Sequence, residues 1–270
     1  MVNKTDAIEI IIYAEGEKDD KPTLVFMSGS ATVAPVYDFK PLYRLLSDEY
    51  RIAVVEKTGY GYSDISQTQR DVDTMLMEVR QGLSLAGEGG PYVLFPHSMS
   101  GLEAIYWAQQ YPDEVAAIIG LDMAVPKSYE YLDASNMTRQ MSVGRASVLL
   151  GLHRLPGIYA LNNVGLNDHD ARQQRFLMYR NAVNINYISE GKAVHDNAIK
   201  VKSSGTLDLP MLMFASDGSQ AGEYWLSCQE EFAADNHAQL IQLDCGHYVH
   251  HFEQEYIAEK SLEYLLEFAK

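Results

Sequence analysis

A serine stands between a strand-like run and a helix-like run. Residues 92–95 are apolar and β-prone, and a helical pattern begins near Leu102. Ser98 lies between them, with the compact Pro96 and Ser100 two positions to either side. So sharp a turn needs small flanking residues, and it holds the serine hydroxyl beside a helix N-terminus. We therefore predict that Ser98 is a nucleophile, against the alternative that it only caps the helix.

A histidine near the other end is suited to activate that serine. His247 follows the strand-like run 240–243 and a glycine turn. A general base must reach the serine hydroxyl from a loop at the same edge of the sheet, and this position allows it. His250 and His251 give a metal-like spacing with His247, but the residues of a known zinc motif do not accompany them. We predict a general base here and no metal.

Two aspartates are candidates to orient the histidine. Asp217 follows the strand-like run 211–215, and Asp122 follows the run 118–121. A carboxylate that accepts a hydrogen bond from the imidazole fixes its tautomer and stabilises the imidazolium. We favour Asp217, with Asp122 as the alternative acid, although an aspartate before glycine is also common in plain turns.

Backbone amides next to these residues can stabilise a negatively charged oxygen. The strand-like run 23–27 ends in the small turn Ser28-Gly-Ser30-Ala31. The Ser30 and Met99 amides are the candidate donors of an oxyanion hole, in which each donor is worth about 3–4 kcal/mol to the barrier. An ordinary turn between strand and helix is the alternative.

The elements that must position these residues alternate along the chain. Apolar runs rich in β-branched residues are typical of strands buried on both faces, as in a parallel sheet. Helical patterns separate them, so we predict an α/β fold with a doubly wound, mostly parallel sheet. The strands are expected at 8–13, 23–27, 51–55, 92–95, 115–121, 211–215 and 240–243, and the helices at 38–47, 72–85, 102–110, 223–234 and 252–269.

The alternation stops after Pro126 and resumes near residue 206. The stretch between is helical in pattern and rich in tyrosine and methionine, including Tyr129, Met141 and Tyr187. We predict a core made of residues 1–126 and 206–270 and an inserted helical lid, the cap segment, at 127–205. An ordinary helical extension of the core is the alternative.

The net charge and the lack of long apolar runs exclude some classes of binding partner. The 270 residues carry a formal net charge of −16, which disfavours nucleic acid and anionic membrane surfaces. No apolar run is long enough for a transmembrane helix, and no signal peptide is apparent. We therefore expect a cytoplasmic protein, with Cys228 and Cys245 as free thiols, that needs no cofactor and acts on a small-molecule substrate. Nothing in the sequence sets an oligomeric state.

With these motifs in place, the chain resembles the α/β-hydrolase superfamily, in its branch of lidded serine esterases and proline-iminopeptidase-like enzymes. Lys57-Thr-Gly-Tyr-Gly-Tyr-Ser-Asp64 is similar to the family's Arg-Gly-x-Gly-x-Ser loop, and Cys245-Gly-His247-Tyr also matches. Ser28 stands where the family usually has histidine. Pro96 and Ser100 replace the two glycines that the family has around the serine, in the sharp strand-to-helix turn called the nucleophile elbow. The resemblance implies a triad of Ser98, Asp217 and His247, an oxyanion hole and a cap over the pocket.

The expected activity is hydrolysis of a small or medium carboxylic ester through an acyl-enzyme. Two alternatives stay open. A proline-iminopeptidase-like aminopeptidase needs acids to hold the substrate amine, for which the cap segment offers Glu130, Asp133 and Glu190. The elbow without glycine motivates the other, a non-catalytic protein that binds small molecules on the same scaffold.

Overall fold

The core of the molecule is one seven-stranded sheet. A computed structural model describes residues 8–155, 157–158 and 161–268. The strands lie in the order β1-β3-β2-β4-β5-β6-β7, and only β1 runs antiparallel to its neighbour. Their bounds are β1 Ile11–Glu15, β2 Thr23–Met27, β3 Ile52–Glu56, β4 Tyr92–Pro96, β5 Val115–Leu121, β6 Met211–Ala215 and β7 Gln239–Gln242. The predicted α/β class and the mostly parallel sheet are confirmed.

Burial explains why these runs form central strands. Every residue of β2, β3, β4 and β6 is buried, because helices cover both faces of a parallel sheet. The edge strands β1 and β7 are only partly buried. The first strand begins at Ile11 rather than at Ile8, and it continues to Glu15.

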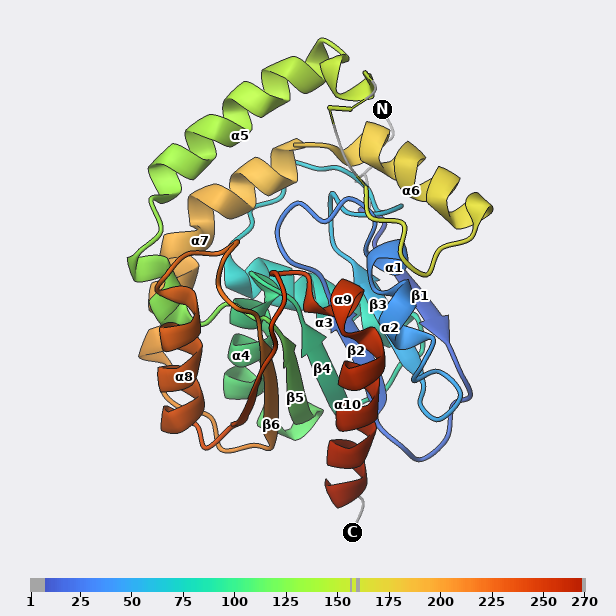
Figure 1. The fold of residues 1–270 in the computed structure, drawn as a ribbon, viewed down its shortest axis with the longest axis vertical. Helices are drawn as coiled ribbons and strands as arrows, with labels where there is room; N and C mark the ends of the chain where they lie inside the picture. Colours follow the sequence, from blue (N-terminus) through green and yellow to red (C-terminus); the bar gives the residue numbers. More distant parts are fainter. Residues whose placement is uncertain (1–7, 156, 159–160, 269–270) are drawn as a thin grey trace, which may run out of the picture.

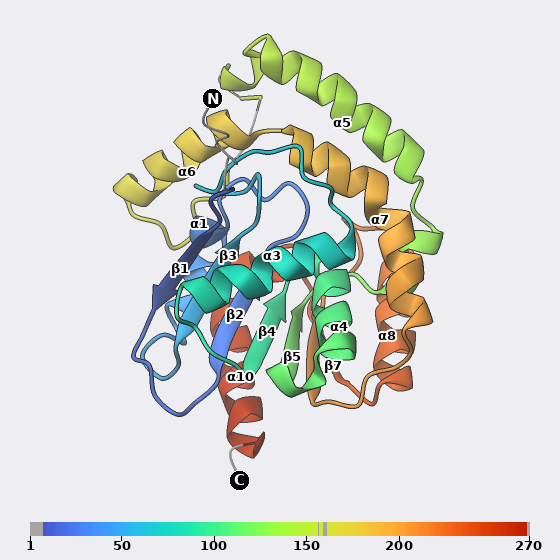
Figure 2. The ribbon, with the colours of Figure 1, turned by 180° about the vertical axis from the view of Figure 1, so that it is seen from behind.

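Two helical layers flank the sheet. One layer is formed by α3 Val72–Leu85, α4 Ser100–Gln110 and α8 Trp225–Asp235, which pack in one apolar cluster with side chains from the sheet. The other is formed by α1 Pro35–Asp38, α2 Lys40–Tyr43, α9 Val249–Phe252 and α10 Gln254–Phe268. Figure 1 shows α1, α2 and α10 in front of the sheet, and Figure 2 shows α3 and α4 on the opposite side.

Two predicted helices are each divided. The helix expected at 38–47 appears as α1 and α2, because Pro41 in the first turn of α2 has no amide N–H to continue α1. The helix expected at 252–269 is preceded by α9, which ends at Phe252 before α10 begins. Residue 269 lies outside the described residues.

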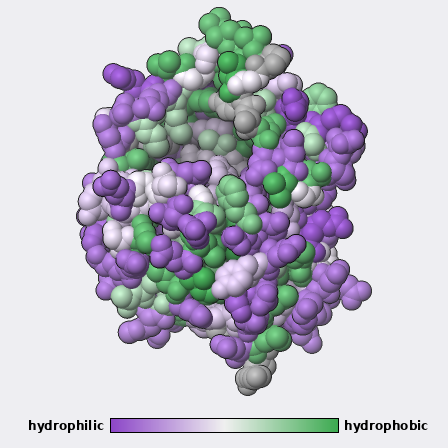
Figure 3. All heavy atoms as spheres, viewed as in Figure 1, coloured by the Kyte–Doolittle hydropathy of each residue, from purple (hydrophilic) through white to green (hydrophobic). Residues whose placement is uncertain are grey.

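The cap segment holds helices and no strand in its described residues. It contains the 3-10 turns η2 Pro126–Glu130 and η3 Leu152–Arg154, and the helices α5 Ala134–Leu149, α6 Asp168–Asn181 and α7 Ile185–Ser203. In Figure 1 these three helices lie above one end of the sheet. Figure 3 shows apolar residues at the top of the molecule, and Leu149 and Leu150 at the end of α5 are exposed. Its standing as a separate cap domain stays a prediction.

Two smaller expectations concern the thiols and the membrane. Cys228 is buried, Cys245 is partly exposed, and both are free thiols. Among the helices that the structure describes, none combines the length and the apolar character needed to cross a bilayer.

Candidate active site

Ser98 occupies a strained turn at the end of β4. Its φ of 53° lies in the left-handed region, which is unusual for a residue with a side chain. The turn is fixed on both sides, since the Ser98 carbonyl accepts hydrogen bonds from the Gly101 and Ala124 amides at 2.9 and 2.8 Å. The turn leaves the side chain partly exposed at the N-terminus of α4.

The compact flanks of the elbow have defined contacts. Ser100 is fully buried, and its hydroxyl donates to the Met27 and His97 carbonyls at 2.7 and 2.8 Å. A Cβ on Gly101 would lie 2.2 Å from the Ala124 carbonyl oxygen. The closest approach in this elbow therefore falls on Gly101, one position after the place where the family pattern has glycine.

His247 reaches Ser98 from the loop after β7. Its Nε2 lies 2.9 Å from the Ser98 hydroxyl, and its Nδ1 lies 2.6 Å from the Asp122 Oδ2. With Nδ1–H donating to the carboxylate, Nε2 is free to accept the serine proton. The Gln220 side chain also accepts the His247 amide at 3.1 Å, which fixes the loop.

The acid that contacts the histidine is Asp122, the alternative candidate, so the expected bond from the ring to Asp217 is wrong. Asp217 is exposed, and its carboxylate accepts the Ser219 amide at 2.8 Å, as in an ordinary turn. β5 lies between β4 and β6 in the sheet. The end of β5 is therefore the nearer of the two strand ends to Ser98, and it delivers Asp122 beneath the imidazole.

Asp122 is set up to stay ionised. It is fully buried, and its Oδ1 accepts three hydrogen bonds of 2.8 Å, from the Ser216 amide, the Trp225 indole and the Gln229 amide. Burial by itself raises the pKa of this carboxyl, but the His247 hydrogen bond and charge, with the Ser216 and Gln229 donors, bring the pKa below its usual value. A buried anion beside His247 stabilises the imidazolium.

The turn after β2 lies against Ser98. A Cβ on Gly29 would stand 2.5 Å from the Ser98 Cβ and 3.2 Å from its hydroxyl, so only glycine allows this approach. Within the described part of the chain, the Ser30 and Met99 amides make no hydrogen bond to a protein acceptor. Two free donors beside Ser98 are what an oxyanion hole requires.

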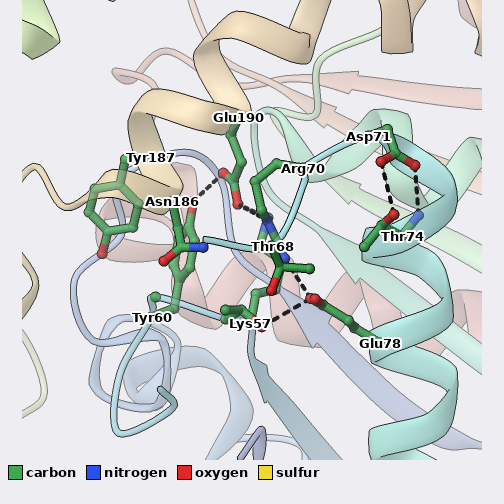
Figure 4. Close-up of polar contacts among 12 residues, drawn as sticks. Lys57, Tyr60, Thr68, Arg70, Asp71, Thr74, Glu78, Asn186, Tyr187 and Glu190 are labelled. Carbon is green, nitrogen blue, oxygen red and sulfur yellow. Dashed lines mark hydrogen bonds and ion pairs between the residues drawn. The ribbon is translucent and has the colours of Figure 1, made fainter. Parts of the chain in front are cut away.

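A buried network from the cap segment supports that turn. The Ala31 amide donates to the Tyr60 hydroxyl at 3.3 Å, and the hydroxyl donates to Glu190 of α7. Glu190 also lies 3.5 Å from Arg70 and 3.8 Å from Lys57. Figure 4 shows the Tyr60, Arg70 and Glu190 side chains converging. The network links α7 to the residue that follows Ser30, a contact that the sequence analysis did not anticipate.

His97 is a second residue that the sequence analysis missed. It is buried, its Nε2 donates to the His247 carbonyl at 3.1 Å, and its ring lies 4.8 Å from the His247 ring. Burial lowers the pKa of His97 well below the usual range, and the charges of His247 and His250 lower it further. The ring is therefore a neutral support for the loop that carries His247. Its position next to Ser98 was the available signal.

His250 and His251 contact a carboxylate rather than His247. The three groups Asp38, His250 and His251 bring ligand-type atoms within 4.8 Å of one another. Each carboxylate oxygen of Asp38 already faces one imidazole, His250 at 2.9 Å and His251 at 3.2 Å. The other His251 nitrogen, Nδ1, accepts from Asn162 at 2.9 Å. Hydrogen bonds thus account for the cluster, and we assign it no metal.

The sequence has relatives among known proteins. No protein-family model matches the sequence. The uncharacterized protein YbdG of Bacillus subtilis is 33% identical over 96% of this chain and 83% of its own length. A 2-(acetamidomethylene)succinate hydrolase of Mesorhizobium japonicum is 29% identical over 44% of this chain and 41% of its own.

Solved structures share the whole fold. A haloalkane dehalogenase from Bradyrhizobium elkani superposes with a TM-score of 0.74 at 16% identity, covering 97% of this chain and 100% of that one. An enol-lactonase from Burkholderia xenovorans gives 0.69 at 15% identity, covering 96% and 97%. Both likenesses show that the chain shares the α/β-hydrolase fold with these two proteins.

Proposed function

Because the chain has the α/β-hydrolase fold and belongs to one family with the Bacillus subtilis protein YbdG, we propose that it is a serine hydrolase that cleaves a small or medium carboxylic ester through an acyl-enzyme. The observation that carries the proposal is the unbroken hydrogen-bonded chain from Ser98 through His247 to Asp122. This is the order of a Ser-His-Asp triad, in which the imidazole takes the hydroxyl proton and the buried carboxylate stabilises the imidazolium.

The proposed reaction has two halves. His247 takes the Ser98 proton as the hydroxyl oxygen attacks the ester carbonyl, and the Ser30 and Met99 amides bind the oxygen that becomes negative. His247 then protonates the departing alcohol, which leaves an acyl group on Ser98. Water, deprotonated by His247, attacks this acyl group and releases the acid, and Ser98 recovers its proton.

The nature of the nucleophile separates this proposal from other reactions of the fold. Carbon–halogen and epoxide cleavage on this scaffold use a carboxylate nucleophile, and position 98 is serine. One structural neighbour is named an enol-lactonase, an enzyme that opens a cyclic ester, and this name favours ester chemistry. We therefore place an oxygen ester ahead of a halide or epoxide substrate.

The aminopeptidase alternative gains no support from the acids of the cap segment. Glu130 is paired with Lys202 at 2.6 Å, and Asp133 caps α5 through the Asn136 amide. Glu190 is buried and bonded to Tyr60. Each of these carboxylates has a partner within the chain, and none of the three lines the cavity beside the triad, so they give no specific support to an amine-binding site.

A fluorophosphonate probe and a panel of short-chain esters test the proposal. We expect the wild type to be labelled and to hydrolyse esters, Ser98→Ala to lose both properties, and His247→Ala to be labelled far more slowly. A folded wild-type protein that takes up no label and cleaves no ester would instead support the non-catalytic binding protein.

A further inference from the structure

A cavity of about 360 Å³ opens beside the triad, between the cap segment and the core. Residues on both sides of the triad line it. Ala31 follows the candidate donor Ser30, Tyr248 follows His247, and Gln220 holds the His247 amide. The cavity itself is lined by neighbours of the triad and by no triad member, so a group that occupies it belongs to a part of the ligand away from the Ser98 hydroxyl.

The cavity carries polar side chains that the protein itself does not satisfy. Gln174 of α6 is 5% exposed, and its carboxamide has no hydrogen-bond partner among the described residues. Thr32 is 6% exposed, and its hydroxyl oxygen is likewise without a partner. A buried polar group left unpaired has lost its hydrogen bonds to water without replacement, so a ligand that pairs with it is favoured over one that does not.

The charges of the lining residues indicate whether the ligand group is neutral or charged. Among the described residues that line the cavity, none is lysine or arginine, and the Asp38 carboxylate is shared by His250 and His251. Asn162 is committed to His251 and to the Val164 amide. Among the described lining residues, the buried polar atoms without a partner are thus the Gln174 Oε1 and the Thr32 hydroxyl oxygen, and these neutral groups match a neutral hydrogen-bonding group better than a carboxylate or phosphate.

We propose that this cavity is a subsite for a hydroxyl or amide group on the ester substrate, with Gln174 as its specificity-determining residue. This inference rests on the proposed function, because it concerns the substrate of the same triad. A hydroxyl of the substrate donates to the Gln174 oxygen or accepts from its nitrogen, since the carboxamide can present either atom. An alkyl group of the same size leaves Gln174 and Thr32 unpaired, and the site discriminates against it.

Two isosteric pairs of esters test the proposal. The pairs are methyl 3-hydroxybutanoate with methyl 3-methylbutanoate, and 2-hydroxyethyl butanoate with propyl butanoate, so that a hydroxyl replaces a methyl group on either side of the ester. We expect the wild type to favour the hydroxylated member of at least one pair by about tenfold or more in kcat/KM. Equal values in both pairs would overturn the subsite.

Matched variants assign the preference to the cavity. Gln174→Leu is expected to reduce the preference to nearly one, chiefly by raising KM for the hydroxylated ester, while the alkyl ester is still cleaved. Gln173→Leu, on the same helix but outside the cavity lining, is expected to keep the wild-type preference. If Gln174→Leu fails to fold, Thr32→Val serves as the second variant, and it is expected to reduce the same preference. Equal preferences in all four proteins would overturn the assignment.

A binding measurement separates this inference from the proposed function. In the Ser98→Ala protein, calorimetric titration with the same esters reports affinity without turnover. If the wild type cleaves no ester but Ser98→Ala binds the hydroxylated esters in a manner that depends on Gln174, the enzyme assignment fails and the subsite stands. If esters are cleaved without preference and bind equally, the subsite fails and the enzyme stands.

Discussion

At the scale of single residues, the acid of the triad is decided by burial and by donors from another element. Asp122 and Asp217 each follow a strand, and no local pattern ranks them. What distinguishes Asp122 is that Trp225 and Gln229 of α8, more than 100 positions later, both donate to its carboxylate. A contact over that separation depends on how the helix packs, and it is not visible in the residues around either aspartate.

The two aspartates therefore differ sharply in their expected mutational effects. Asp122→Asn should lower kcat by about 10⁴-fold, because an amide at this position favours the wrong imidazole tautomer. Asp217→Asn serves as the matched control and should stay near wild type, since its side chain is exposed and away from the ring. Steady-state kinetics with one ester checks both. A large loss in Asp217→Asn with little loss in Asp122→Asn would reverse our assignment.

The rest of the triad was within reach of the sequence. Ser98 and His247 each follow a run whose strand character is plain, and the carboxyl ends of parallel strands meet at one edge. The supporting residues were not accessible in the same way. His97, Tyr60 and Gln220 act through contacts with loops that only the folded chain brings together.

At the scale of elements, the cap segment does more than cover the site. Helix α7 sends Glu190 down to the Tyr60 hydroxyl, and that hydroxyl receives the Ala31 amide next to the candidate oxyanion donor. Ala31 has a φ of 61°, an uncommon conformation that needs support from its surroundings. Tyr60 is therefore a positioning residue that links α7 to the turn after β2.

Removing one oxygen atom tests that link. Tyr60→Phe should lower kcat by about tenfold to a hundredfold with little change in KM, less than the loss of an oxyanion donor itself. Affinity for a trifluoromethyl ketone, which mimics the oxyanion, should fall by the same factor. Tyr62→Phe, a neighbouring and more exposed tyrosine, is the control. A change confined to KM would show instead that Tyr60 contacts the substrate.

The elements themselves were largely predictable, and the errors have physical causes. Continuous apolar runs located the central strands to within a residue, because burial on both faces leaves a strong signal. The edge strand β1 is half exposed, and its bounds were displaced. The helix expected at 38–47 is divided in the structure, because Pro41 interrupts a stretch whose apolar spacing is otherwise helical.

At the scale of the whole molecule, ionisable groups buried in the core connect stability to pH. Glu56 at the end of β3 is fully buried, and burial raises its pKa to about 7, against the lowering effect of the Tyr62 amide. The folded state thus holds a proton that the unfolded state releases near 4.5. A raised carboxyl pKa contributes stability that is present at low pH and lost as pH rises toward 7.

Replacing the Glu56 carboxyl with a neutral carboxamide should remove this loss of stability at high pH. Glu56→Gln is expected to exceed the wild type in free energy of unfolding by about 1–3 kcal/mol at pH 8, with the difference shrinking toward pH 5. Urea unfolding at several pH values measures it, and Glu49→Gln on the exposed surface is the control. A difference that is constant with pH would mean that Glu56 stays ionised in the fold.

The hydrogen bond from the Ser216 amide to Asp122 joins the two ends of the stretch that contains the cap segment. Asp122 stands just before the chain leaves the sheet for the cap segment, and Ser216 stands just after the first strand on its return. The Asp122 carboxylate therefore connects the chain just after β5 with the chain just after β6. Asp122 is thus held by the core alone, so a change in the cap helices should leave the acid in place and act first on the turn after β2, which depends on Glu190 of α7.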